Sequence, residues 1–179
     1  MNIKTFVRSA LALGAAAATV TGYAATDTAT ATANVIVPIT ITKAVDLSFG
    51  RFARGAGGTV TVSNSGARTA TGTILSAVGS TPTAARFNIV GDALATYSIA
   101  IAPDAAISNG GVGVVNNMAL TISSDLTGAN VTTGDVTVAG GTLSAGGLQS
   151  IFIGGTLTVN VAQVAGAYTG NIAVTVEYN

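Results

Sequence analysis

The sequence predicts an all-β protein built as a sandwich of two sheets, and three observations support this prediction. Apolar and polar residues alternate with a period of two in about ten short runs. Glycine, asparagine, aspartate or proline stands between most of these runs, as expected for turns. After Ala25, no segment keeps the apolar spacing of an amphipathic helix for long. Because no fixed-period repeat indicates a solenoid, two packed antiparallel sheets are the expected architecture.

Residues 1–24 have the three parts of a secretory signal peptide. Lys4 and Arg8 provide the positive start, an uncharged apolar stretch follows in residues 10–20, and Gly22-Tyr23-Ala24 is a cleavage site of the small-x-small kind. The apolar stretch is shorter than the roughly 20 residues that span a bilayer. We therefore expect cleavage before Ala25. The mature protein would then pass through the periplasm to the surface or exterior of a bacterium.

The mature chain is expected to begin with an N-terminal arm, residues 25–34. From Ala29 to Ile41 every odd position is apolar, whereas the even positions are mostly threonine or asparagine. Pro38 lacks an N–H group and therefore separates this arm from the first strand of the domain. A strand with small apolar side chains on one face suits addition to the edge of another sheet. An ordinary first strand of the same domain, or a frayed tail, is the alternative. The residues on the apolar face are Ala29, Ala31, Ala33 and Val35.

The β domain is expected to occupy residues 35–179. Turn sequences that tolerate positive φ, such as Asn64-Ser65-Gly66 and Gly154-Gly155, separate its strands. The expected strands are 35–42, 46–51, 58–63, 72–78, 85–90, 96–102, 118–123, 135–138, 148–154, 156–163 and 171–178.

Composition argues against an enzyme or a metal protein. The chain has no histidine and no cysteine, so the commonest general base, zinc ligands and thiol nucleophiles are absent. Asp104, Asp125 and Asp135 do not form a calcium-loop pattern. The formal net charge is +0 and the arginines are dispersed, so the sequence shows no basic patch that would bind the phosphates of a nucleic acid. We expect no catalytic residue, no cofactor, no metal and no nucleic-acid partner.

The aromatic residues weigh against a chain whose strands span an outer membrane. Such a protein needs two girdles of interfacial aromatics. The aromatics that follow residue 24 are too few for this: Phe49, Phe52, Phe87, Tyr97, Phe152, Tyr168 and Tyr178.

The C-terminal strand alternates up to Asn179, and its pattern resembles that of bacterial chaperone–usher fimbrial subunits, the pilins. These subunits have a glycine at the fourteenth position from the end. Alternating apolar residues follow at the eighth, sixth and fourth positions, and the penultimate residue is aromatic. The corresponding residues here are Gly166, Ile172, Val174, Val176 and Tyr178.

The pilin resemblance implies an incomplete immunoglobulin-like sandwich that is completed by a donated strand. A periplasmic chaperone would first bind the groove beside the C-terminal strand. At an outer-membrane usher, the arm of the next subunit would then take its place. Two features depart from the family: the cysteine pair of many fimbrial subunits is missing, and the side chains of the arm are mostly alanine.

Most of the mature chain is also similar to a family of small exported bacterial proteins known as domain of unknown function 4402. The segments that carry this similarity are residues 31–41, 47–52, 57–62 and 166–178, together with the signal peptide. The resemblance implies no biochemical activity.

Together these patterns predict a structural subunit of a bacterial surface filament, which associates with copies of itself by inserting its arm into a neighbour's groove. The alternative is a monomeric secreted sandwich that binds a ligand such as carbohydrate through its loops. Arg51 and Arg54, beside a run of glycines, would then contact an anionic glycan. An exported hydrolase is a third interpretation. Asn130 begins a formal glycosylation sequon.

Overall fold

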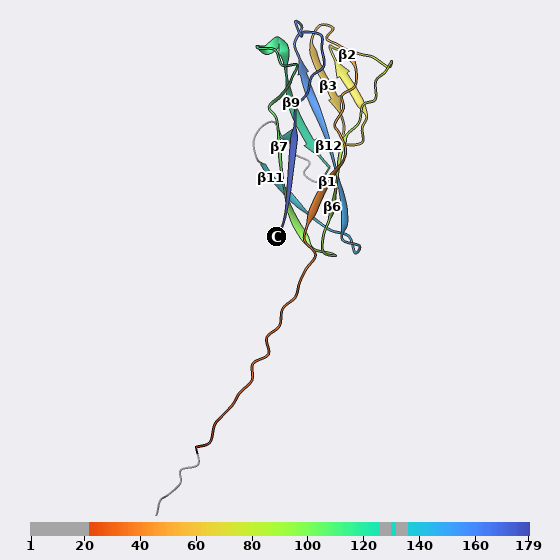
Figure 1. The fold of residues 1–179 in the computed structure, drawn as a ribbon. Coiled ribbons are helices and arrows are strands. Elements are labelled where there is room, and N and C mark those ends of the chain that lie inside the picture. Colours follow the sequence, from red (N-terminus) through yellow and green to blue (C-terminus); the bar gives the residue numbers. More distant parts are fainter. Residues whose placement is uncertain (1–21, 126–129, 132–135) are drawn as a thin grey trace, which may run out of the picture. The chain divides into compact units, whose positions relative to one another are not determined.

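The computed structural model describes residues 22–125, 130–131 and 136–179 (Figure 1). The chain divides into two units, Met1–Asn34 and Val35–Asn179. In the first unit, residues 22–34 have exposed side chains and no helix or strand. The expected signal peptide up to residue 21, Asp135 and part of the Asn130 sequon lie outside the described residues.

The second unit is built from β-strands, which confirms the predicted fold class. Beside the strands, the described residues contain one short 3-10 helix, η1 (Val114–Asn116). The larger sheet is organised around a long strand, β12. The strands of this sheet are β1 (Thr40–Val45), β3 (Gly58–Val62), β4 (Arg68–Thr71), β6 (Ala85–Val90), β8 (Ala106–Ser108), β9 (Asn117–Ser124), β10 (Asn130–Val131) and β12 (Leu148–Val159).

β12 connects the parts of the larger sheet, because its two halves pair with different strands. The first half pairs antiparallel with β6, which in turn pairs with β1. The second half pairs with β3 and with β9, and Gly155 lies opposite both Val62 and Ile122. One residue pairs with two strands only across opposite edges, so β3 and β9 flank β12. β4 continues the sheet beyond β3, and β8 and β10 both pair with β9.

The second sheet has three described strands in the order β11 (Val136–Thr142), β7 (Thr96–Pro103) and β13 (Ile172–Tyr178). All its pairs are antiparallel. A small separate pair joins β2 (Phe52–Ala53) to β5 (Ile74–Leu75).

Inward-facing side chains from both sheets form one apolar core, as the period-two alternation predicted. Tyr97, Ile99 and Ile101 come from the smaller sheet. The larger sheet and adjoining segments contribute Phe49, Val60, Val62, Ala85, Ile89, Met118, Leu120, Ile122, Leu143, Ile151, Ile153, Leu157 and Val159.

The structure corrects the predicted strands at several places: for example, the predicted strand 72–78 is reduced to Ile74–Leu75, and residues 160–163 lie outside β12. Three further corrections bear on the groove and the core. The first strand begins at Thr40 rather than at residue 35, because Pro38 has no N–H group for a sheet ladder. Residues 46–51 form no strand and have only an isolated bridge between Ser48 and Thr83. Gly154-Gly155, expected as a turn, lies inside β12. A side chain at Gly154 would collide with the backbone of Val62, so glycine here permits the close approach of β3.

The strand registers define two ends of the domain. Thr40 and Leu148 both pair with Val90, and Tyr178 pairs with Tyr97, so these residues lie at one end. We call it the lower end, as drawn in Figure 1. The last residues of β12 and the first residues of β9 and β13 lie at the opposite end, which we call the upper end.

Candidate functional site

Two neighbouring strands, β1 and β13, each have an unpaired edge. Among the strands that the structure describes, β1 pairs only with β6 and β13 only with β7. The two strands come close to each other, but no ladder of backbone hydrogen bonds joins them in the described residues. An unpaired edge presents a row of N–H and C=O groups to which a further strand can add.

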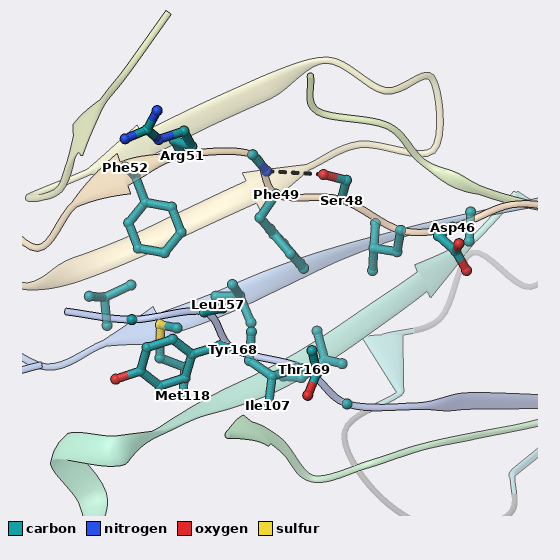
Figure 2. Close-up of a pocket in the computed structure, with 18 of the residues that line it drawn as sticks. Asp46, Ser48, Phe49, Arg51, Phe52, Ile107, Met118, Leu157, Tyr168 and Thr169 are labelled. Atoms are coloured by element: carbon teal, nitrogen blue, oxygen red, sulfur yellow. Dashed lines mark hydrogen bonds between the residues drawn. The ribbon is translucent and has the colours of Figure 1, made fainter. Parts of the chain in front are cut away.

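A groove of about 1330 Å³ opens next to these edges (Figure 2). One wall is the segment from Lys43 to Arg54, which follows β1, and the other is the segment from Gln163 to Ile172, which leads into β13. The groove reaches upper-end residues such as Arg54 and Val164, but none of its lining residues comes from the lower halves of β1 and β13.

The floor of the groove is apolar and belongs to the core. Met118, Leu120 and Leu157 line it and are nearly inaccessible to solvent. In Figure 2, Phe49 and Phe52 point from the first wall towards the floor, while the guanidinium of Arg51 points away from it. Because the floor is apolar, it suits an apolar side chain rather than a charged one.

Arg68 holds the first wall in place. Its Nη1 donates hydrogen bonds to the carbonyl oxygens of Phe49 (2.9 Å) and Arg51 (3.1 Å), and to Ser80 Oγ (2.8 Å). Its Nη2 donates to the carbonyl oxygen of Ser76 at 2.8 Å. The planar guanidinium therefore joins the wall to the loop after β5, and fixes the backbone from which Phe49 enters the groove.

Gln163 organises the second wall. It is only 5% exposed, and its Nε2 lies within hydrogen-bond distance of the carbonyl oxygens of Val115 (2.9 Å) and Asn117 (3.2 Å) and of Tyr168 Oη (2.9 Å). Its own carbonyl oxygen accepts a bond of 2.9 Å from Arg54 Nη1. Arg54 thereby links the two walls at the upper end.

Tyr178 closes the lower end of the gap between β1 and β13. Its hydroxyl donates to the carbonyl oxygen of Val37 at 2.6 Å and accepts from the backbone N–H of Asp92, also at 2.6 Å. A side chain at Gly91 would collide with the Tyr178 ring, so the glycine makes room for this contact.

The predicted groove residues take up two different positions. Ile172 lines the groove, and Val174, Val176 and Tyr178 continue along β13 as half-buried side chains packed against the core. Gly166 also lines the groove but is not part of the strand, because β13 begins at Ile172.

The candidate donor residues lie in both units. Ala29, Ala31 and Ala33 belong to the first unit, and Val35 is the first residue of the second. All four side chains are exposed.

Sequence reasoning missed the residues that shape the walls. Phe49 and Phe52 count among the aromatic residues of the sequence and belong to the family-like segment 47–52, but their spacing of three gives no sign that both enter one groove. Arg68 and Gln163 carry no local signal, because their partners lie far away in the chain.

The described residues contain no cluster of three or more histidine, cysteine, aspartate or glutamate side chains that could hold a metal ion. In the same part of the chain, no helix is long and apolar enough to cross a membrane.

The fold has a counterpart among solved structures, the P pilus rod subunit PapA. The two chains superpose with a TM-score of 0.52 at 16% sequence identity, over 79% of this chain and 99% of PapA. The domain is therefore an immunoglobulin-like sandwich of the pilin kind. No curated protein sequence matches the chain.

Residues 39–178 match the domain of unknown function DUF4402, so the chain belongs to this family. The two resemblances identified from the sequence, to DUF4402 and to the pilins, are thus confirmed at the level of family and fold.

Proposed function

We propose that the protein is a structural subunit of a bacterial cell-surface filament, in which residues 25–34 of one copy occupy the groove of the next. The observation that carries this proposal is the pair of unpaired strand edges, β1 and β13, beside an apolar groove of about 1330 Å³. A single added strand would pair with both edges and cover the floor between them.

The arm has the chemistry of such a strand. In an extended segment, Ala29, Ala31, Ala33 and Val35 point to one face and the intervening threonines to the other. Backbone hydrogen bonds to the two open edges would supply much of the affinity. The alanines are small, and buried apolar area contributes only about 25 cal/mol per Å². Pairing of the backbone therefore matters more here than filling of the groove.

The route to the surface follows from the N-terminus and from the pilin resemblance. We expect cleavage before Ala25, passage through the periplasm, and a chaperone that covers the groove until an outer-membrane usher brings in the next arm. Mass measurement of the protein recovered from the cell exterior should give Ala25 as its first residue. A mature form that retains Lys4 and Arg8 would contradict this route.

The function needs neither catalysis nor a cofactor. The groove binds a segment of another copy, and its specificity comes from strand pairing and from side chains at alternate positions. We therefore propose a non-enzymatic role.

Substitutions on the two faces of the arm test the proposal. The double variant with Ala31→Asp and Ala33→Asp places unpaired charges on the groove-facing side and should prevent assembly. The matched control carries Thr30→Asp and Thr32→Asp on the opposite face and should still assemble. Filament length is measured by electron microscopy and β content by circular dichroism, which should be unchanged in both variants.

Deletion of residues 25–34 separates the proposal from its alternatives. The shortened chain should remain β-rich, should form no filaments, and should bind a synthetic peptide of residues 25–35. A wild-type protein that is a stable monomer, and whose fold collapses without the arm, would contradict the proposal. In that case the arm is the domain's own first strand, and ligand binding through the loops becomes the better interpretation.

A further inference from the structure

We propose that the two ends of the domain form a second contact between successive copies, in which the upper end of one copy packs against the lower end of the next. This inference rests on the proposed function, since the arm is what brings the two copies together. It concerns a different surface from the groove.

The upper end carries an exposed apolar surface, the upper patch, made of Val112, Val114, Val161 and Val164. Val112 is 92% exposed. The backbone N–H of Val164 donates to the carbonyl oxygen of Val115 at 2.9 Å, which holds the turn after β12 against η1. Since Val164 also lines the groove, the upper patch adjoins the mouth of the groove.

The lower end carries a second exposed apolar surface, the lower patch, made of Ile36, Val37, Val90, Leu94 and Leu148. Val90 and Leu148 are directly paired across β6 and β12. Tyr178 connects Val37 to Asp92, two residues from Leu94 in the chain. The patch adjoins the start of the domain, where the arm is attached.

Leu94 is the most unusual residue of the lower patch. It is 65% exposed and its φ is +60°, in the left-handed region where glycine or asparagine is favoured. Within one copy, neither burial nor backbone conformation favours a leucine at this position. A strained, exposed apolar residue is therefore expected to act in a contact outside its own domain.

The length of the connecting chain brings the two patches together. The bond between Tyr178 and Val37 closes the lower end of the gap between β1 and β13, whereas the groove opens beside the upper part, so an inserted arm would leave through the upper end. From Asn34 to Thr40 the chain spans at most about 20 Å. The lower end of the donor domain must consequently lie close to the upper end of the acceptor.

Charge favours the same arrangement. The upper end has the exposed arginines Arg51 and Arg54 and one exposed carboxylate, Asp104, whereas Asp92 and Glu177 lie at the lower end. The ion pair found among the described residues is Lys43–Asp46. Arg51, Arg54, Asp92 and Glu177 therefore have no ion-pair partner within that part of the chain. Upper-to-lower packing brings opposite charges together, whereas lower-to-lower packing would bring acidic residues together.

Cysteine cross-linking tests the contact directly, since the chain has no cysteine of its own. Copies with Leu94→Cys and copies with Val112→Cys are assembled into mixed filaments and treated with a short bis-maleimide. We expect covalent dimers in the mixture and none with either variant alone. Copies with Thr175→Cys, on the exposed face of β13 between the two ends, are the matched control and should give none.

The variant Leu94→Asn tests whether the contact strengthens the filament. Asparagine tolerates the left-handed backbone, so the subunit should unfold at the same or a higher urea concentration than the wild type. It should bind the arm peptide with unchanged affinity, yet form filaments several times shorter.

The outcomes separate the two proposals. Three results would overturn the end-to-end contact and leave strand exchange intact. They are filaments that form without Leu94–Val112 cross-links, filaments that cross-link through Leu94→Cys alone, and filaments that keep their length with Leu94→Asn. Wild-type protein that neither forms filaments nor binds the arm peptide would overturn the proposed function, and this contact with it.

Discussion

The hydroxyl of Tyr178 donates a hydrogen bond of 2.6 Å to the carbonyl oxygen of Val37, and so ties the last strand to the segment that precedes the first. The two residues are 141 positions apart in the chain. This bond closes the lower end of the gap between β1 and β13, while the upper part remains a groove. A strand added along the full length of β13 would therefore have to displace this contact.

The substitution Tyr178→Phe should destabilise the domain by about 1 kcal/mol, the usual net effect of a lost hydrogen bond. It removes the donor to Val37 and the acceptor for the Asp92 N–H while keeping the aromatic ring. Urea unfolding measures the loss. In the strand-exchange mechanism the same variant should bind the arm peptide more tightly, because the contact that closes the lower end is already broken.

The control for this substitution is Thr175→Val, which removes an exposed hydroxyl from the same strand. It should leave the free energy of unfolding unchanged. Equal stability of the Tyr178→Phe protein and the wild type would show that the bond does not contribute to the folded state.

Tyr97 should make the domain less stable in alkali. Its side chain is 0% exposed, its hydroxyl has no hydrogen-bond partner in the described residues, and burial, assisted by the charge of Asp125, raises its pKa. In the unfolded chain a tyrosine loses its proton near pH 10. The folded state keeps the proton to a higher pH, so the free energy of unfolding should fall as pH rises above about 10.

The variant Tyr97→Phe should lose this part of the pH dependence, which urea unfolding at neutral and alkaline pH would measure. At neutral pH it should be as stable as the wild type or more so, since the hydroxyl it removes is buried without a partner. The comparison is Tyr168→Phe, because the Tyr168 hydroxyl donates to Val164 O at 2.7 Å and its loss should destabilise the domain. If the free energy of unfolding falls equally in alkali for Tyr97→Phe and the wild type, Tyr97 is not the source of the alkaline destabilisation.

The sequence predicts the strands well where alternation alone decides them. β6 and β13 match the expected ranges to within one residue, because apolar residues occupy their inward positions while most of their outward positions are polar. Gly154-Gly155 was misread because glycine marks both turns and close backbone approaches. Which of the two applies depends on β3, a strand about 90 residues earlier in the chain.

Only one of the two walls of the groove could be predicted from the sequence. The alternation of Ile172, Val174 and Val176 identified the strand that borders it. The first wall could not be found in this way, since residues 46–51 alternate like a strand yet form none. Their position depends on Arg68 and on the bridge to Thr83, which are tertiary contacts without a local pattern.

Arg68→Lys should not be a conservative change. A lysine keeps the charge, but its single ammonium group cannot reach the Phe49, Arg51 and Ser76 carbonyl oxygens together as the planar guanidinium does. We expect a loss of roughly 1.5–3 kcal/mol in the free energy of unfolding, the range for hydrogen bonds to a charged group. Arm-peptide binding should weaken as well, because Phe49 is no longer held in the groove. The exposed Arg86 provides the control, since Arg86→Lys should change neither quantity.

The two inward-facing glutamines allow the same substitution to be compared in opposite settings. Gln163 Nε2 lies within hydrogen-bond distance of the Val115 and Asn117 carbonyl oxygens, whereas Gln149 Oε1 is buried with no partner in the described part of the chain. Gln163→Leu removes the buried donor to both carbonyl oxygens and should cost about 1–3 kcal/mol. It should also weaken arm-peptide binding, because the second wall loses one of its links to η1. Gln149→Leu removes an unpaired oxygen and should cost little or stabilise the domain. Urea unfolding and peptide titration of both variants measure the contrast, and equal losses at the two sites would show that Gln163 does not hold the wall.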